Sequence, residues 1–270
     1  MLLPEGAPES AVNELNQALG VYKPLCVQYT IFIVSVARGE FGESFQYKVP
    51  ARRVVTGRIP ATVQLGLAAM TLTLIVAVPI GVIAGARRGS LADYGTMSLA
   101  VLGQALPNFW LGIVLIIVFG VKLRWLPTSG SATPKHIILP AITLAAYPVA
   151  LIARLIRSNI IEVLSKDYVR TARSKGLAEW QVVMRHALKN AAIPVVTVVG
   201  LLFGLLLGGA VITESIFGWP GIGKLVVDAI LWRDYPIVQT VLILSASVFV
   251  VINLITDLFY GLIDPRIRYE

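Results

Sequence analysis

Long apolar stretches alternate with short polar segments along most of this chain. Five of the stretches have the roughly 20 predominantly apolar residues that a helix needs to cross a bilayer. They are residues 61–86, 95–121, 137–156, 191–213 and 236–260. Because the hydrocarbon interior offers the backbone no water, each stretch is expected to be helical. The pattern predicts an all-α integral membrane protein, a polytopic bundle with about five transmembrane helices.

The composition agrees with this class. The 270-residue chain is 56% hydrophobic and 14% charged, whereas a soluble domain carries about 25% charged residues. The net charge of +8 does not indicate nucleic-acid binding, because Lys and Arg of membrane proteins gather in cytoplasmic loops. Cys26 is the only cysteine, which excludes an internal disulfide and a Cys-based metal site. His136 and His186 are too far apart in sequence to form a metal motif, so no metal site is predicted.

The distribution of basic residues predicts the orientation. The loop at 87–88, the loop at 154–189 and the C-terminal tail carry 12 Lys and Arg, against 5 in the opposite loops. By the positive-inside rule, the long basic loop and the C-terminus are cytoplasmic. We therefore expect an external segment (1–60), a transmembrane domain (61–260) with a cytoplasmic loop (157–190), and a cytoplasmic tail (261–270).

This orientation leaves residues 1–60 outside with no segment to export them. We therefore expect a further transmembrane helix upstream of this sequence. The apolar run at 27–37 is too short to span and favours an interfacial or buried helix.

The energy source is indicated by an absence in the sequence. No Asp, Glu, Lys or Arg lies near the middle of a predicted span, where ion-coupled carriers usually place ionisable groups. Energy supplied by a partner protein is therefore favoured over a secondary, ion-coupled transporter, which is the alternative, and over a membrane scaffold.

The stretch Gly218–Lys224 has the spacing of a phosphate-binding loop. However, Leu225 stands where magnesium needs Ser or Thr, and no strand precedes the stretch. The sequence thus contains neither a complete ATP site nor a set of catalytic residues, so the chain is not predicted to be an enzyme.

The cytoplasmic stretch 167–190 combines a glycine with an amphipathic pattern. Gly176 can end a helix in a left-handed conformation at no steric cost. Beyond it, one helical stripe is apolar and contains Leu177, Trp180, Val183, Met184, Ala187 and Leu188. From the residues alone, this stripe suits either a docking helix that transmits motion to two spans or a helix that lies on lipid or on the end of the bundle.

Glycines recur every four residues on the fourth predicted span, at Gly200, Gly204 and Gly208. Small-residue stripes allow helices to approach closely, so the stripe predicts helix packing within the bundle or against a second subunit. Lining of a solute path is the alternative.

Several motifs together resemble those of one family. They are Lys23-Pro-Leu-Cys-Val-Gln-Tyr29, Gly39-Glu-Phe-Gly-Glu-Ser44, Arg58-Ile-Pro-Ala-Thr62, Asp167-Tyr-Val-Arg-Thr-Ala-Arg-Ser-Lys-Gly-Leu177, His186-Ala-Leu-Lys-Asn-Ala191, Glu214-Ser-Ile-Phe-Gly-Trp-Pro-Gly-Ile-Gly223 and Asp264-Pro-Arg266. From about Leu19 to its end, the chain resembles a permease subunit of the dipeptide/oligopeptide (and nickel) branch of bacterial ATP-binding-cassette (ABC) importers. Such permeases usually begin with one more transmembrane helix, which agrees with the argument from topology.

The resemblance implies the type I ABC importer permease fold and a translocation path for dipeptides, oligopeptides or a related small solute. Nickel and glutathione importers share the motifs, so the solute stays open. The implied partners are a second homologous permease, two ATP-binding subunits, an extracytoplasmic solute-binding protein and the bilayer of a bacterial or archaeal cell membrane, but no nucleic acid. The permease itself would hold no cofactor, because the partner subunits bind ATP.

The resemblance also assigns residues. General ABC importers carry Glu-Ala-Ala, three residues and Gly in the loop that docks on the ATPase, and here only Ala172 and Gly176 match that pattern. The implied ATPase-coupling residues are Ala172, Arg173, Gly176, Leu177, Trp180, Met184 and His186. The implied loop at the external mouth, where the solute is handed over, contains Phe217, Pro220, Gly221 and Gly223.

Overall fold

The computed structural model describes residues 8, 22–207 and 210–263 of the chain. Within these residues the chain is mainly helical, and their only β-pairing is an isolated bridge between Glu43 and Pro50. The helices in chain order are α2 (Leu25–Ala37), α3 (Ala51–Ala86), α4 (Leu91–Ala105), α5 (Asn108–Leu115), η1 (Ile116–Lys122), η2 (Pro134–Ile137), α6 (Ile138–Leu164), α7 (Asp167–Ser174), α8 (Glu179–Gln181), η3 (Val182–Ala187), α9 (Leu188–Leu207), α10 (Val211–Ile216), α11 (Ile222–Leu231) and α12 (Tyr235–Ile263). The predicted all-α class is confirmed.

Three continuous helical stretches are long and apolar enough to cross a membrane: Ala51–Ala86, Pro134–Leu164 and Tyr235–Ile255. Two bent pairs also qualify if each is counted as one span, Leu91–Lys122 with a bend of 100° and Glu179–Leu206 with a bend of 52°. The total of up to five agrees with the prediction. The first candidate span, α3, begins at Ala51, earlier than the predicted start of the span at 61.

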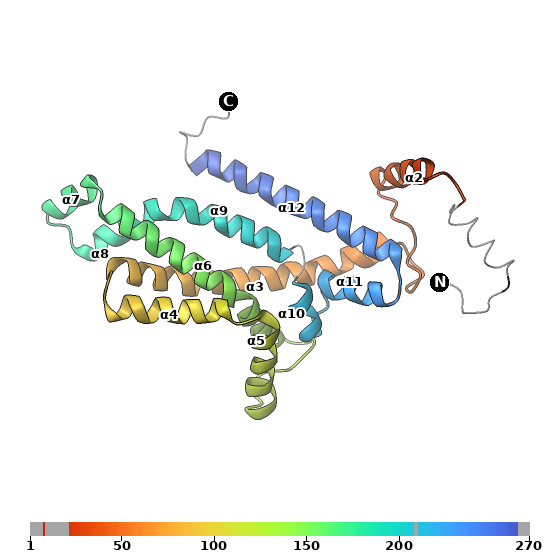
Figure 1. Ribbon diagram of the computed structural model, residues 1–270, viewed down its shortest axis with the longest axis horizontal. Helices are drawn as coiled ribbons and strands as arrows, with labels where there is room; N and C mark the ends of the chain where they lie inside the picture. Colours follow the sequence, from red (N-terminus) through yellow and green to blue (C-terminus); the bar gives the residue numbers. More distant parts are fainter. Residues whose placement is uncertain (1–7, 9–21, 208–209, 264–270) are drawn as a thin grey trace. The chain divides into compact units, whose positions relative to one another are not determined.

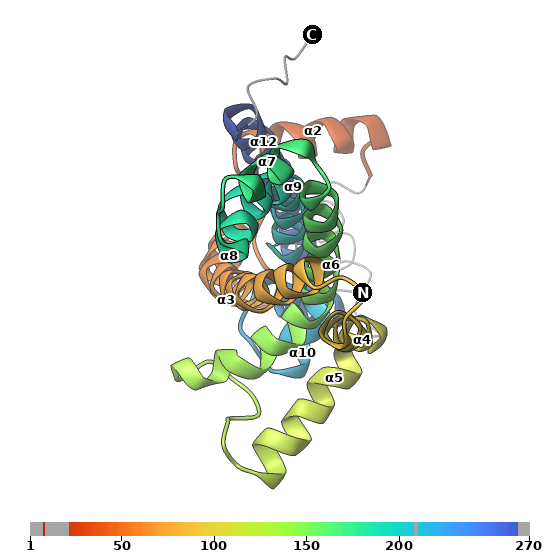
Figure 2. The ribbon, with the colours of Figure 1, turned by 90° about the vertical axis from the view of Figure 1, so that its left-hand side faces the viewer.

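The second predicted span is not one straight helix but two helices separated by a break. Helix α4 ends at Ala105, and Leu106 is extended, with φ −81° and ψ 129°. Pro107 causes the break, because the ring of a proline disfavours the α conformation in the residue before it. The chain resumes as α5 at Asn108 and leaves the direction of α4 at a large angle (Figures 1 and 2).

The described residues fall into two compact units, one with residues 22–57 and Val226–Ile243, the other with Arg58–Leu225 and 244–263. In the larger unit, α3, α6 and α9 lie side by side around an apolar core (Figure 1). Residues of α6 such as Ile152 and Ile156 are almost fully buried there. A β-carbon on Gly81 of α3 would lie 2.7 Å from the Ala153 carbonyl oxygen, so the backbones of α3 and α6 approach closely there.

The smaller unit is organised by Asp234, which is fully buried before α12. Its carboxylate accepts a 2.5 Å hydrogen bond from the Ser44 hydroxyl and one of 3.1 Å from the Gln46 N–H. The motif that ends at Ser44 is thereby held to the start of the last helix within this unit.

Helix α2 contains the predicted apolar run and is 13 residues long, with no buried residue. It is too short to span the hydrocarbon core. The alternative of a buried helix is not supported by the described residues, and the interfacial position stays a prediction.

Candidate coupling segment and external loop

The segment between α6 and α9 consists of two short helices joined at Gly176. Helix α7 ends at Ser174, and Gly176 has a φ of +80° before the chain enters α8 at Glu179. This is the left-handed conformation that the sequence indicates, and glycine adopts it without the clash that a β-carbon brings. A β-carbon built there would meet nothing within 4 Å, so only the backbone conformation restricts this position.

The inner face of the segment anchors it to the end of α6. Val169, Ala172 and Val182 form a buried cluster against Val163 and Leu164. Of the predicted coupling residues, Ala172 therefore has a packing position and is 5% exposed.

An ion pair crosses the glycine turn. Nη2 of Arg173 donates to Oε1 of Glu179 at 2.6 Å, and Nε donates to Oε2 at 3.1 Å. This two-point contact links the two helices across the turn, because a guanidinium fork matches a carboxylate in one plane.

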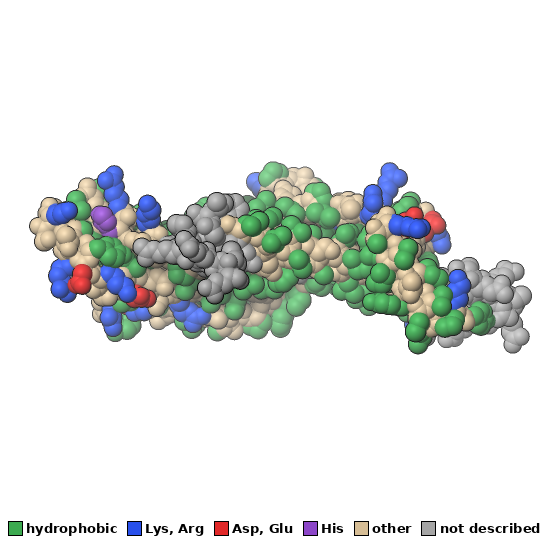
Figure 3. All heavy atoms as spheres, turned by 90° about the horizontal axis from the view of Figure 1, so that it is seen from above, with side chains coloured by type: hydrophobic (Ala, Val, Ile, Leu, Met, Phe, Trp, Pro, Cys, Tyr) green, Lys and Arg blue, Asp and Glu red, His purple; other side chains and the backbone are tan. Residues whose placement is uncertain are grey.

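Three of the predicted coupling side chains project from the segment into open space. Leu177 is 38% exposed, Met184 50% and Trp180 65%. Lys, Arg, Asp and Glu side chains gather around this end of the larger unit, over α7 and α8 (Figure 3). His186 is half-buried, and its carbonyl accepts a 2.7 Å hydrogen bond from the Asn190 side chain.

The predicted apolar stripe is not a single exposed face, which corrects the sequence interpretation. Val183 and Ala187 are buried, as is Val182, which the stripe did not include. The reason is that the chain forms a π-helix from Val182 to Ala187. A π-helix has more residues per turn than an α-helix, so a stripe drawn with α-helical spacing turns away from its starting face.

The loop after α9 is built around the carboxylate of Glu214, which is fully buried. Glu214 accepts hydrogen bonds from the Thr62 hydroxyl at 2.9 Å and the Lys224 N–H at 3.0 Å. The Thr62 oxygen in turn accepts from the Ile222 N–H at 2.8 Å. The indole N–H of Trp219 donates to the Ala61 carbonyl at 2.8 Å. The loop is thus held to the first turns of the predicted first span.

The predicted loop residues have distinct roles in this arrangement. Gly221 leaves room for Glu214, because a β-carbon there would overlap the carboxylate. A β-carbon on Gly223 would lie 2.7 Å from the Val211 Cα. Phe217 is 2% exposed and Pro220 is half-buried.

Burial raises the pKa of Glu214, while hydrogen bonds from the Lys224 N–H, the Thr62 hydroxyl and the Gly223 N–H lower it and offset part of the shift. The same contacts argue against a nucleotide in the loop. Its Gly223 and Lys224 N–H groups, which would face a phosphate in a phosphate-binding loop, donate to a carboxylate of the chain itself.

Two glycines of the predicted packing stripe, Gly200 and Gly204, lie on α9. A β-carbon on Gly204 would lie 3.3 Å from the Phe249 ring on α12, so α9 and α12 approach closely there. Gly200 lines a groove of about 490 Å³ together with Ile252 and Ile255. Gly208 lies outside the described residues.

Sequence reasoning did not single out Thr62, Glu214, Asp93 or Arg157. Thr62 and Glu214 stand in quoted motifs, but a carboxylate beside a span is more often exposed, and their separation in sequence gives no sign of the contact. For Asp93 the available signal was Ser90 three residues earlier, a pattern that marks the start of a helix.

The comparison with known proteins decides the family. The sequence model of the family described as "Binding-protein-dependent transport system inner membrane component" matches residues 77–269. The chain belongs to this family. The permease is therefore the membrane subunit of an ABC importer and is not itself an enzyme, and the ion-coupled alternative is set aside. An importer of this class also contains ATPase subunits.

Curated relatives match almost the whole permease. It is 43% identical over 97% of its length to a probable peptide ABC transporter permease of Sinorhizobium fredii, covering 87% of that protein. It is 44% identical over 97% of its length to a di/tripeptide permease of Pseudomonas aeruginosa, covering 86% of it. It is 42% identical over 98% of its length to a glutathione permease of Escherichia coli K12, covering 86% of it.

Solved structures confirm the fold. The inward-facing MetNI methionine ABC transporter superposes with a TM-score of 0.65 at 16% identity, over 78% of this chain and 96% of that one. An amino acid ABC transporter with histidines gives a TM-score of 0.57 at 17% identity, over 80% and 94%. The permease thus has the predicted type I importer fold.

Proposed function

We propose that the permease forms the translocation path for dipeptides, oligopeptides or a related small peptide. The relatives reported above are named for peptides, di/tripeptides and glutathione, which share the peptide bond. Peptides are therefore the favoured solute class.

The proposed assembly contains a second homologous permease, two ATP-binding subunits and an extracytoplasmic solute-binding protein. ATP is bound by the ATPase partners, because the phosphate-loop-like stretch of this chain is occupied by its own Glu214. Residues 1–60 face outward, the segment 157–190 and the tail 261–270 face the cytoplasm, and the transmembrane domain 61–260 lies between them.

One observation carries the proposal that the segment docks on an ATPase. Leu177, Trp180 and Met184 leave large apolar side chains exposed on a segment whose other face is packed against α6. Exposed apolar side chains with a polar surround are typical of protein interfaces, and Trp is among the residues that contribute most to binding energy there. The charged side chains over α7 and α8 favour a protein partner over the lipid interior (Figure 3).

The experiment reconstitutes the full complex in liposomes and measures uptake of a labelled dipeptide presented by the binding protein. Uptake should require hydrolysable ATP and both ATPase subunits. A matched sample without the ATPases provides the control. Dipeptide uptake in that sample, driven by a proton or sodium gradient, would contradict the proposal.

A further inference from the structure

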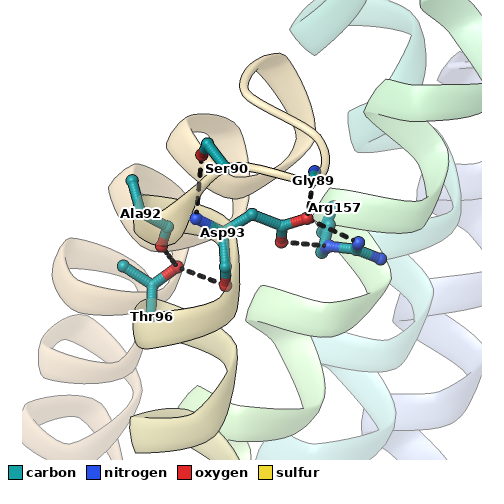
Figure 4. Close-up of polar contacts among 6 residues, drawn as sticks. All are labelled: Gly89, Ser90, Ala92, Asp93, Thr96 and Arg157. Carbon is teal, nitrogen blue, oxygen red and sulfur yellow. Dashed lines mark hydrogen bonds and ion pairs between the residues drawn. The ribbon is translucent and has the colours of Figure 1, made fainter.

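An ion pair joins the start of α4 to α6, outside the stretch 167–190 and outside the loop around Glu214. Nε of Arg157 donates to Oδ1 of Asp93 at 2.6 Å, and Nη2 donates to Oδ2 at 2.8 Å (Figure 4). The Asp93 side chain is 2% exposed and that of Arg157 31%. A two-point contact between a guanidinium and a carboxylate fixes orientation as well as distance.

The start of α4 is shaped to hold Asp93 in place. Ser90 caps the helix and accepts a 3.2 Å hydrogen bond from the Asp93 N–H, while the Gly89 N–H donates to Oδ2 of Asp93 at 3.0 Å (Figure 4). The carboxylate also lies in the first turn of α4, where the helix dipole favours a negative charge. Asp93 is thus oriented toward α6 by contacts on its own side.

Arg157 lies on α6, ten residues before the coupling segment begins at Asp167, in the part of α6 that is here called the base of the segment. Two residues further along, Nδ2 of Asn159 donates to the Ala191 carbonyl on α9 at 3.2 Å. A β-carbon on Gly85 of α3 would lie 3.1 Å from the Arg157 carbonyl oxygen. The base is therefore tightly packed, and a shift of the segment would displace Arg157.

The helices α4 and α5 together form the broken span, and α5 contacts the external loop. Helix α5, which follows α4 after Pro107, packs against α6 and α10. A β-carbon on Gly112 of α5 would lie 3.2 Å from the Phe217 ring. The α4–α5 unit thus contacts the base of the coupling segment at its start and the loop around Glu214 near its end.

We propose that the Arg157–Asp93 ion pair is the positioning contact through which the coupling segment moves α4 and α5. The inference rests on the proposed function, in which the segment docks on an ATPase. A partly buried ion pair adds little net stability compared with apolar packing, whereas its fixed geometry suits the transfer of a rigid-body shift from one helix to another.

The experiment uses the full complex in liposomes and measures two quantities, the ATP hydrolysed and the labelled dipeptide imported. The variants are Asp93→Asn, Arg157→Gln and the two together. Each single variant should lower the peptide imported per ATP by about tenfold, in the range of typical coupling between sites. The double variant should match the single ones, because the contact is already lost in each of them. The amount of co-purified ATPase should stay unchanged, because the docking side chains are intact.

Arg154→Gln is the matched control. Arg154 also joins α6 to α4, through Gln104, but it is exposed and its partner is neutral. This change should alter the ratio by less than about twofold, as for other exposed polar pairs.

The outcomes separate the two proposals. The unaltered complex shows whether ATP drives peptide import at all, so a failure of the proposed function appears there. Assembled single variants that keep the unaltered ratio would overturn the role of the ion pair. Should neither single variant assemble, Arg157→Lys, which keeps the charge and loses the fork, decides by the same ratio. If that variant too fails to assemble, the pair is a folding contact and the proposal is overturned.

Discussion

The hydroxyl of Thr62 donates a 2.9 Å hydrogen bond to the carboxylate of Glu214, 152 residues later in the chain. The same oxygen accepts the Ile222 N–H at 2.8 Å. One side chain near the start of the first predicted span therefore holds both the buried acid and the turn of the predicted external loop. Because all three groups are buried, none of them can exchange its partner for bulk water.

Thr62→Val should destabilise the permease, while Thr62→Ser should not. Valine has nearly the shape of threonine but leaves the buried Ile222 N–H without its partner and removes one of the hydrogen bonds to Glu214, at a cost of about 1–3 kcal/mol. Serine keeps the hydroxyl. The measurement is the apparent melting temperature of the detergent-solubilised permease, which should fall by several degrees for valine only, at about 2–4 °C per kcal/mol. Equal melting temperatures for the two variants would show that the hydrogen bonds are not needed.

Gly176→Val should weaken coupling, while Gly176→Asn should be tolerated. The φ of +80° is left-handed, and a β-carbon there has open space. The cost is thus conformational, about 1–2 kcal/mol for an ordinary residue, more for a β-branched one and less for Asn. Solute-stimulated ATP hydrolysis by the complex should fall with valine at normal membrane levels of the permease. If valine and asparagine behave alike, the turn does not set the docking angle.

Reporter fusions after Ser90 and Gly130 should give opposite compartments, with Ser90 in the cytoplasm. The basis is the positive-inside rule: the predicted cytoplasmic loops and tail carry 12 Lys and Arg, whereas the opposite loops carry 5. The fusions also distinguish two forms of the bent pair Leu91–Lys122, whose 100° bend suits either a broken span or a re-entrant loop. Alkaline phosphatase, active only outside the cytoplasm, provides the readout. The same compartment for both fusions would indicate a re-entrant loop and overturn the proposed topology.

The sequence predicted features that depend on local chemistry. The length of the apolar stretches is enough to predict long helices, because a helix pairs its own backbone N–H and C=O groups where the membrane provides no water. The left-handed turn at Gly176 also followed from residue type, because only glycine adopts it freely. Pro107 indicates a kink or the end of a span, but a proline does not determine the size of the bend, which here depends on the packing of α5 against α6 and α10.

Contacts between distant residues could not be predicted from one sequence. Asp93 and Arg157 are 64 positions apart, and the local sequence around either residue does not indicate that the two are in contact. The exposure of Trp180 beside the burial of Val182 depends on a π-helix that has no clear sequence signal. Substrate class and partners rest on the relatives for the same reason, because solute contacts come from folded surfaces and from other subunits.

The central claim is that the segment from Asp167 to Asn190 docks on the ATPase through its exposed apolar side chains. Its most direct test is the amount of ATPase that co-purifies with the Trp180→Ala permease, compared with Trp180→Phe. Trp180 is 65% exposed, so its loss should not disturb the fold of the permease. Truncation of a large apolar anchor should lower the co-purified ATPase by about tenfold or more, and phenylalanine should retain most of it. Equal ATPase with alanine and with the unaltered permease, at unchanged dipeptide uptake, would contradict the account.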